Sequence, residues 1–488
     1  MKFFASAAEM RAVPRSAEFR NGGVAFWYRA DGLPERRPAL PGSADYDVCV
    51  VGAGYTGLWT AYYLKKARPD IRVAVLEREF AGFGASGRNG GRLSAEFPGP
   101  REAPADAHGK GGMIALQRAM MRSVDEVVSV AAAEGIDADI AKGGLRVVAT
   151  NPAQRTRLLE RVRHLQEWGY WPEDLYPLDP CRGPRLQVDG ALAAAFSPHA
   201  ARVQPARLAV GLARAVEALG VDVFEGTAVT RIRPRSGTER PAAVTEHGTV
   251  RADHVIRATE GYTGGVQGDR PGWRPVTSSM IATEPLSAEM WEHIGWADRE
   301  VLTDAAHAHV YAQRTADDRI AIGGRGTPYR LGGGREDTGA TPPQTIAELW
   351  RVLARLFPVA ASVPVAHAWS GVLGVPRDGR PGVHLDPETG LGWAGGYGDS
   401  GVTAANLAGR TLRDLVLGRA TDLTRLPWVG PGARVWEPEP LRWVGGQVAN
   451  GLYRGADRRE SDRVPHTSRL AGIAGRIGGG RATGAADR

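Results

Sequence analysis

The chain has 488 residues, of which 43% are hydrophobic and 24% charged, and its formal net charge is +7. This is the composition of an ordinary globular protein, long enough for two or three domains with large cores. The two cysteines, Cys49 and Cys181, exclude a disulfide framework and a multi-cysteine metal site. The N-terminus lacks an apolar stretch long enough for a signal peptide, so we expect a cytoplasmic protein that does not bind membranes.

The net positive charge does not predict a nucleic-acid partner. Only five of the 61 basic residues are lysine. The arginines are scattered among acidic residues, and no basic stripe with interleaved aromatics precedes the C-terminal tail. We therefore expect a solvated surface and no nucleic-acid binding.

The first structural motif in the chain is a βαβ unit. Residues 46–51 read as a buried strand, 52–57 as a turn rich in glycine and 58–67 as a helix. Residues 72–77 then read as a second apolar strand, parallel to the first. Further along the chain, the pattern predicts a helix over 205–219 and strands at 221–224, 229–232, 254–259, 310–313 and 319–323.

The turn carries a G-x-G-x-x-G motif that predicts dinucleotide binding. Gly52 allows a tight turn, Gly54 lets the backbone approach a pyrophosphate, and Gly57 lets helix and strand pack closely. The amides at the helix start favour phosphate charge. Glu77 can accept hydrogen bonds from ribose hydroxyls and would repel the 2′-phosphate of NADP. The alternative interpretation is a plain glycine turn in an α/β fold. The predicted cofactor contacts here are Gly52, Gly54, Tyr55, Thr56, Gly57, Glu77 and Arg78.

The loop after the second strand favours FAD over NAD. Most residues from Gly82 to Gly91 are Gly, Ala or Ser. A backbone that passes beside a flat, bulky ring needs such residues at the contact. The predicted contacts are Ala85, Ser86, Arg88, Asn89, Gly90 and Gly91, although Arg88 and Asn89 could instead merely cap the loop.

These two motifs resemble those of the D-amino-acid-oxidase-like (DAO) superfamily of FAD enzymes. The chain is most similar to the branch that holds γ-glutamylputrescine oxidase, whose members carry similar V-G-x-G-Y-T-G-L and G-A-S-G-R-N-G-G runs. Residues 392–403, followed by a helix through Leu415, resemble the C-terminal flavin turn of the family. There a helix start points at the N1–C2=O edge of the flavin and stabilises the reduced anion. The family usually has Gly-His where this chain has Asp399-Ser400.

The pattern and the resemblance, which covers about residues 45–430, imply an α/β fold (α+β overall). We expect a Rossmann-type FAD-binding domain interleaved with a mixed-sheet substrate domain, as in the DAO and glutathione-reductase-like fold. The expected segments are an N-terminal extension (1–44), the FAD-binding domain (45–100, 200–265 and 365–430), the substrate domain (101–199 and 266–364) and a C-terminal extension (431–488). Beyond about residue 457 the composition predicts disorder.

The resemblance also implies further FAD contacts and their nature. These are Val229, Ala258, Ser400, Gly401, Val402 and Thr403. Relatives with covalent flavin use a cysteine in the C-terminal half or a histidine after the second strand. This chain has no cysteine after Cys181, and its first histidine there is His108, so the FAD is expected to be non-covalent.

The activity implied by the resemblance is oxidation of an amine or amino acid. A hydride leaves the carbon next to nitrogen, and the imine hydrolyses. The electrons then pass to O2 or another acceptor. No lysine follows Lys142, so the lysine that activates oxygen in some relatives is absent, and oxidase and dehydrogenase both stay open.

Four residues are candidates for the catalytic end of the site: Arg325, Tyr311, Trp369 and His309. Arg325 could bind a carboxylate or support charge on the flavin, or form a plain salt bridge at a strand end. Trp369 and Tyr311 could wall a pocket, with core packing as the alternative. His307 and His309 alternate onto one face of a strand, but no third ligand stands at a convincing spacing, so no metal is expected.

Two other functions stay open from the sequence. One is a flavin-dependent tailoring enzyme acting on a larger metabolite. The other is a non-catalytic dinucleotide-binding protein, against which the intact glycines of all three motifs argue.

Overall fold

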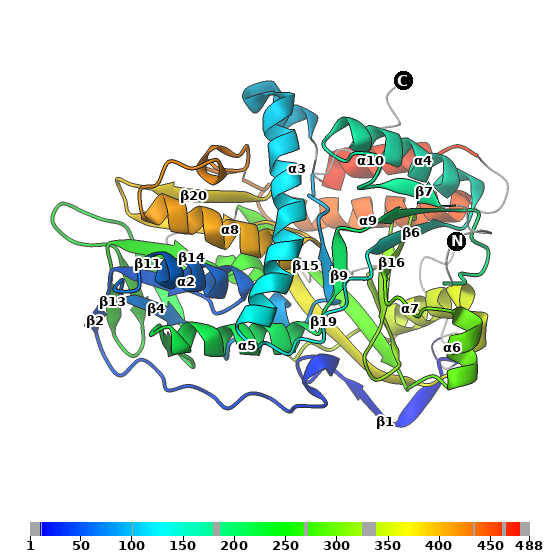
Figure 1. Cartoon of the computed structure of the whole chain (residues 1–488), viewed down its shortest axis with the longest axis horizontal. Helices are drawn as coiled ribbons and strands as arrows, with labels where there is room; N and C mark the ends of the chain where they lie inside the picture. The colour runs from blue at the N-terminus through cyan, green and yellow to red at the C-terminus, as the bar shows by residue number, and fades with distance from the viewer. Residues whose placement is uncertain are drawn as a thin grey trace.

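The computed structural model describes residues 10, 12–99, 101–178, 186–267, 272–324, 338–432, 435–460 and 465–478. Its two large sheets have six and nine strands. The six-stranded sheet with its helices occupies the left of Figure 1, and most of the nine-stranded sheet lies to the right. This arrangement confirms the predicted fold class.

The six-stranded sheet has the order β10-β4-β3-β14-β21-β20, in which only β20 is antiparallel to its neighbour. Its strands are β3 (Val48–Val51), β4 (Val73–Leu76), β10 (Asp222–Phe224), β14 (His254–Arg257), β20 (Gly382–Asp386) and β21 (Leu391–Gly395). The alternation of side chains along β3 builds two cores. Val48 and Val50 pack under the helices on one face, while Cys49 and Val51 pack on the other face. The predicted βαβ unit is confirmed.

The second face is covered by a four-stranded sheet of the order β11-β12-β13-β2. Its strands are β2 (Ala44–Asp45), β11 (Val229–Arg233), β12 (Ala242–Thr245) and β13 (Thr249–Arg251). The strand predicted at 229–232 therefore lies in this small sheet.

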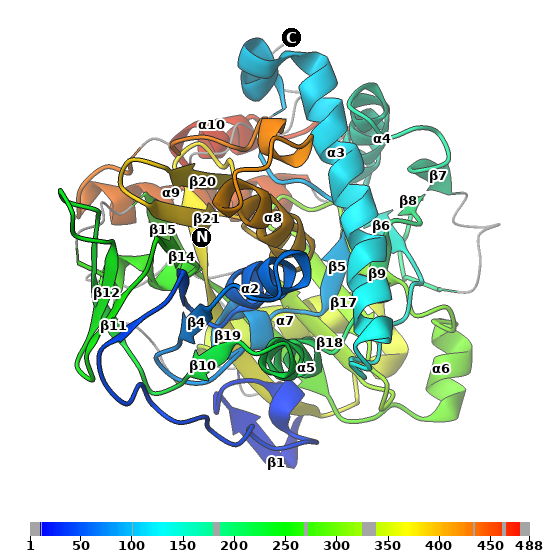
Figure 2. The ribbon, with the colours of Figure 1, turned by 60° about the vertical axis from the view of Figure 1, so that its left-hand side comes forward.

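Helices α2 (Tyr55–Ala67), α5 (Pro205–Ala218) and α8 (Gly401–Val416) cover the first face. Figure 2 shows α2 between α8 and α5, with the long α3 (Glu102–Ala133) beside them. A Cβ at Gly409 of α8 would lie 2.7 Å from Cβ of Trp59 of α2, so only glycine lets these helices approach so closely.

The nine-stranded sheet has the order β1-β19-β15-β18-β17-β16-β6-β8-β7. These strands are β1 (Arg15–Asn21), β6 (Leu145–Ala149), β7 (Tyr176–Leu178), β8 (Ala193–Ser197), β15 (Trp273–Thr283), β16 (Val301–Asp304), β17 (Val310–Arg314), β18 (Ile320–Gly324) and β19 (Val365–Pro376). Helices α4 (Pro152–Glu167), α6 (Ala288–Ile294) and α7 (Pro343–Leu356) pack around it, and β5 (Arg92–Ser94) and β9 (Ala200–Arg202) form a separate pair.

The sheets divide the chain differently from the expected segments at two places. Residues 365–376, which we assigned to the FAD-binding domain, form β19 and pair with β15 from Val365 to Pro376. Residues 15–21 of the N-terminal extension add the edge strand β1 to the same sheet. Both segments pair with strands far away in sequence, which local patterns do not reveal.

The C-terminal extension differs from the expected disorder over the part that the structure describes. It contains helices α9 (Leu441–Arg459) and α10 (Arg469–Gly478), which pack against each other. Small residues make this contact, as at Gly478, where a Cβ would lie 3.3 Å from Cβ of Ala449. Composition predicted disorder because large apolar residues are few, whereas close packing of small residues holds this pair together.

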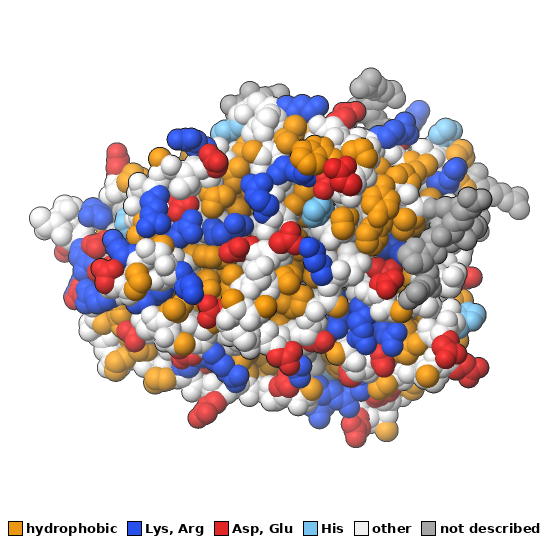
Figure 3. All heavy atoms as spheres, viewed as in Figure 1, with side chains coloured by type: hydrophobic (Ala, Val, Ile, Leu, Met, Phe, Trp, Pro, Cys, Tyr) orange, Lys and Arg blue, Asp and Glu red, His pale blue; other side chains and the backbone are white. Residues whose placement is uncertain are grey.

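Two properties of the surface and the helices bear on possible partners. Among the described residues, none of the helices has the length and apolarity needed to cross a bilayer. Basic and acidic side chains are intermingled on the face shown in Figure 3. Many arginines pair with acids, as Arg240 does with Asp253 at 3.0 Å.

Candidate cofactor and substrate site

A cavity lies between the carboxyl ends of the parallel strands and one side of the nine-stranded sheet. The turn from β3 into α2, the end of β4 and the end of β14 supply one part of its wall. The opposite part comes from Ser278 and Met280 of β15, Tyr311 of β17 and residues 371–373 of β19. Ligands of open α/β sheets bind at such strand ends, so this cavity is the candidate site.

The glycine turn has the geometry that the motif predicts. Gly52 has φ of +108°, and a Cβ there would lie 2.7 Å from the carbonyl oxygen of Ala258. A Cβ at Gly57 would lie 2.0 Å from the carbonyl oxygen of Gly52. Gly57 thus serves packing and does not line the cavity, whereas Gly52 and Gly54 do. The turn is a cradle that side chains would fill, which fits a pyrophosphate.

Helix α2 begins three residues earlier than predicted. Gly54 is its N-cap, and Tyr55, Thr56 and Gly57 already form its first turn. The Tyr55 N–H donates to Ser86 Oγ at 2.8 Å, which ties the helix start to the following loop. Tyr55, Thr56 and Ser86 all line the cavity.

Glu77 is fixed at the end of β4. Its Oε2 accepts the Ala53 N–H at 2.8 Å, and its Oε1 accepts the Glu79 N–H at 3.0 Å. Burial raises the pKa of this carboxyl, although those hydrogen bonds oppose the effect. Arg78 lies over the ring of Tyr262 at 5.4 Å, and both line the cavity with Val229 and Ala258. This end fits an adenosine ribose, because each carboxylate oxygen has a second lone pair for a hydroxyl.

Arg88 and Asn89 hold the glycine-rich loop in shape. Arg88 is 2% exposed; its Nε donates to the Phe83 carbonyl oxygen at 2.7 Å and its Nη1 to that of Ser370 at 3.2 Å. Asn89 Nδ2 donates to the Ser86 carbonyl oxygen at 2.7 Å, and its Oδ1 accepts the Gly91 N–H at 2.8 Å. These are the contacts of the capping alternative. Both residues also line the cavity, as do Ala85 and Gly90, whereas Gly91 does not.

Tyr311 and Trp369 have different roles. The Tyr311 ring lines the cavity, and a Cβ at Gly90 would lie 2.3 Å from it. Its hydroxyl is 3.0 Å from Ser278 Oγ. Trp369 is fully buried away from the cavity, and its Nε1 donates to the Arg88 carbonyl oxygen at 2.8 Å. Core packing therefore describes Trp369; Arg325 lies outside the described residues.

Glu260 is a cavity residue that the sequence analysis missed. It follows β14, has φ of +44°, and its Oε1 accepts the N–H groups of Gly396 at 2.9 Å and Tyr397 at 3.1 Å. Its Oε2 accepts the Gly374 N–H. Burial raises the pKa of this carboxyl to about 7 against those hydrogen bonds. No local pattern predicts a carboxylate that joins segments more than 110 residues away.

The flavin turn after β21 leads into α8. Gly401 and Val402 line the cavity, but Ser400 and Thr403 are buried beside it. Thr403 Oγ1 has no hydrogen-bond partner among the described residues, so a polar acceptor or donor remains available at the start of α8.

Asp399 forms a charged cluster at this turn. Its Oδ2 is 2.9 Å from Arg92 Nη2 and 3.2 Å from His309 Nε2. Arg92 also pairs with Glu96. Partial desolvation would raise the pKa of the Asp399 carboxyl, but the Arg92 charge and the His309 hydrogen bond hold it well below its usual range.

His309 is the second titratable member of the cluster. Its side chain is 44% exposed, so it is only partly desolvated; this desolvation would lower its pKa, but the hydrogen bond to Asp399 and the charge of that group raise it. Arg92 and Asp399 line the cavity, whereas His309 does not.

The two histidines singled out in the sequence do not share a strand face. Residues 305–309 are a loop, and β17 begins at Val310, so strand alternation does not apply to them. His309 contacts Asp399, whereas His307 contacts Glu460 of the C-terminal extension.

Comparison with known proteins agrees with this geometry. The family model described as "FAD dependent oxidoreductase" (DAO) matches residues 47–415. Gamma-glutamylputrescine oxidoreductase of Escherichia coli K12 is 31% identical over 383 residues, which are 77% of this chain and 84% of that protein. Glycine oxidase of Bacillus licheniformis is 27% identical over 383 residues, 76% of this chain and 93% of that protein.

Two solved structures share the fold. Glycine oxidase from Geobacillus kaustophilus superposes with a TM-score of 0.61 at 24% identity, covering 77% of this chain and 96% of that one. L-proline dehydrogenase from P. horikoshii gives a TM-score of 0.65 at 17% identity, covering 80% and 98%.

Proposed function

This chain belongs to the DAO family of FAD-dependent oxidoreductases, and from that premise we propose that it oxidises a carbon–nitrogen bond of a small amine or amino acid. When bound, FAD supplies the hydride acceptor for this chemistry. Two of the relatives described above are named for oxidation of γ-glutamylputrescine and of glycine, which supports a small amine or amino acid as the substrate.

The observation that carries this proposal is that one cavity joins the dinucleotide turn to the nine-stranded sheet. Gly52, Gly54 and Glu77 stand at the cofactor end, and Ser278, Met280 and Tyr311 at the other. A substrate held against Tyr311 would share a compartment with the cofactor and be shielded from water, as hydride transfer requires.

The residues that would hold FAD come from the three motifs. We propose that Glu77 binds the ribose, the first turn of α2 binds the pyrophosphate, and the start of α8 faces the flavin edge. Around them stand Arg78, Ala85, Ser86, Arg88, Asn89, Gly90, Val229, Ala258, Gly401 and Val402. Thr403 would offer its unpartnered hydroxyl nearby.

The proposal is tested by anaerobic titration of the holoprotein with a panel of amines and amino acids. A substrate should bleach the flavin absorbance at about 450 nm. Hydrolysis of the imine should then yield the carbonyl product together with ammonia or an amine. Re-oxidation by O2 is then compared with that by a quinone dye, which distinguishes oxidase from dehydrogenase. A protein that holds FAD yet is reduced by dithionite and by no member of the panel would contradict the proposal.

A further inference from the structure

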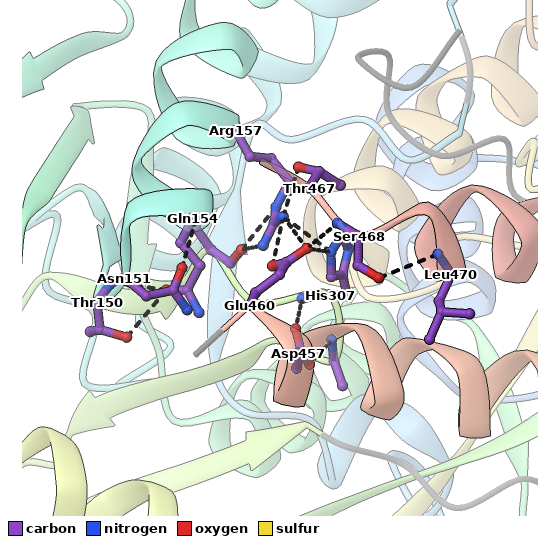
Figure 4. A network of polar contacts seen from close by, with 12 residues as sticks. Thr150, Asn151, Gln154, Arg157, His307, Asp457, Glu460, Thr467, Ser468 and Leu470 are labelled. Carbon is purple, nitrogen blue, oxygen red and sulfur yellow. Dashed lines mark hydrogen bonds and ion pairs between the residues drawn. The ribbon is translucent and has the colours of Figure 1, made fainter. Parts of the chain in front are cut away.

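The loop between β16 and β17 touches two separate parts of the protein. It spans residues 305–309, and its two histidines point to different partners. His309 reaches the flavin turn through Asp399, as described above. His307 reaches the last turn of α9 in the C-terminal extension, which Figure 4 shows.

Two acidic side chains hold this loop: Asp457 in the last turn of α9, and Glu460, which directly follows the helix. Asp457 Oδ1 accepts a hydrogen bond from the backbone N–H of His307 at 2.8 Å, and its Oδ2 accepts one from the backbone N–H of Ala308 at 3.0 Å. Glu460 Oε1 lies 2.7 Å from His307 Nε2. The loop is therefore fastened to the end of α9 through both its backbone and a side chain.

Arg157 of α4 contacts the same groups from the opposite side. We call the set of Arg157, His307, Asp457 and Glu460 the clasp. Its Nη1 lies 3.1 Å from Glu460 Oε2, and its Nη2 donates to the Ala305 carbonyl oxygen at 2.7 Å. The Ser468 N–H, just before α10, donates to Glu460 Oε1 at 2.8 Å. The Glu460 side chain is 1% exposed, so loss of its charge would leave Arg157 without its buried partner.

The same groups have the spacing of a metal site, but their contacts favour a clasp. Ligand atoms of His307, Asp457 and Glu460 lie within 4.8 Å of one another. Arg157 Nη1 is 3.0 Å from His307 Nε2 and already supplies positive charge there. Both oxygens of Asp457 accept backbone N–H groups.

We propose that the C-terminal helices position His309 beside Asp399, with Asp457 and Glu460 as the positioning residues. His309 is two residues from His307 in a five-residue loop, so release of the clasp moves it relative to the flavin turn. The importance of this for catalysis rests on the proposed function, whereas the position of His309 is measurable without any substrate.

The pKa of His309 reports its position. The charged groups that act on it are Asp399 of the flavin turn, Arg92 of β5, Asp304 of β16, and Glu96. Asp399 raises this pKa above its ordinary value. Release of the loop from Asp399 should therefore lower it toward about 6.5.

The experiment is a pH titration of the holoprotein labelled with ¹³C at the histidine ε1 carbon, followed by NMR. His309→Gln identifies the His309 signal among the 11 histidines. Glu460→Gln and Asp457→Asn should each lower the His309 pKa, and Asp457→Asn removes one acceptor with less damage to the fold. Arg459→Gln is the matched control, because Arg459 is exposed on the same helix, and should change nothing.

A double-variant test separates positioning from plain destabilisation. In an Asp399→Asn background the His309 pKa is already low, so adding Glu460→Gln should not lower it further. An unchanged His309 titration in Glu460→Gln and Asp457→Asn, with lower melting temperatures, would overturn the proposal. Failure of every amine to reduce the flavin bears on the proposed function alone, because the titration needs no substrate.

Discussion

Glu260 Oε1 accepts the backbone N–H of Gly396 at 2.9 Å and thereby joins the end of β14 to the flavin turn. Its other oxygen accepts the Gly374 N–H of β19, in the nine-stranded sheet. A Cβ at Gly374 would lie 2.4 Å from Glu260 Oε2, so the contact requires glycine there. One carboxylate thus ties together both sheets at the cavity wall.

Replacement of Glu260 by Gln should loosen the cavity wall. The amide keeps one acceptor oxygen but places an NH2 group against an N–H, either of Gly374 or of the flavin turn. A buried donor without an acceptor costs about 1–3 kcal/mol, so we expect a lower melting temperature and weaker FAD retention. Thermal unfolding and flavin content after gel filtration measure these effects. Equal stability and flavin content in the variant would contradict the bridging role of Glu260.

The charge of Glu260 predicts a specific pH dependence of stability. Its pKa is raised from the ordinary 4.5 to about 7, so between these pH values the folded protein holds a proton that the unfolded chain has lost. Stability from this group therefore falls as pH rises from about 4.5 to about 7. The unfolding free energy of the wild type should therefore fall relative to that of the non-titrating Glu260→Gln variant across that window. Denaturant melts at several pH values measure it, and a wild-type value that rises with pH relative to that of the variant would show that the pKa is not raised.

The parts of this site that the sequence predicted are those whose partners are near in sequence. The turn at Gly52–Gly57, the strand end at Glu77 and the loop before Gly91 are local, so spacing and residue size sufficed. Glu260 accepts hydrogen bonds from residues that are 114 and 136 positions away in sequence. The strand β19 belongs to the nine-stranded sheet because it pairs with β15, which is also distant in sequence. The helix α10 depends on close packing of small residues, whereas the shortage of large apolar residues in its composition predicted disorder. Arg92 joins Asp399 across 307 residues, and no motif marks it.

Gly54→Val should give mostly apoprotein. A Cβ at Gly54 would lie 3.0 Å from Ser86 Oγ, which accepts the N–H of Tyr55 at the start of α2. The valine side chain would occupy the place where the backbone approaches the pyrophosphate. Gly42→Val is the control, because a Cβ there meets nothing within 4 Å. The ratio of flavin to protein absorbance measures the FAD content of both variants. Full FAD content in Gly54→Val would show that the dinucleotide does not bind at this turn.

Acid precipitation of the holoprotein should release all of its FAD. None of the described residues that line the cavity is a cysteine or a histidine, the usual attachment points named above for the family. After trichloroacetic acid and centrifugation, the yellow colour should be found in the supernatant. Flavin fluorescence retained on the denatured chain in a gel would refute non-covalent binding.

Asp399→Asn should reduce stability most in mildly acidic solution. The lowered pKa of Asp399 contributes stability above about 3.8 that is lost as pH falls. The raised pKa of His309 contributes stability below about 6.5 that is lost as pH rises through its folded value. Both charges are present between these pH values, so the unfolding free energy of the wild type should exceed that of Asp399→Asn by the largest amount there. A difference that is constant from pH 4 to 9 would show that His309 does not pair with Asp399.

Tyr311→Phe should weaken substrate binding while FAD is retained. The ring packs against Gly90 and would keep its place, but the hydroxyl that meets Ser278 Oγ at 3.0 Å would be lost from the cavity wall. A neutral hydrogen bond contributes about 0.5–1.5 kcal/mol, which is roughly a 2- to 12-fold weaker apparent affinity for the amine. Ser278→Ala is the matched control, because it removes the partner of Tyr311 and keeps the phenol. Anaerobic reduction at varied amine concentration measures both variants. Unchanged affinity in Tyr311→Phe, with full flavin content, would place the substrate away from the β17 side of the cavity.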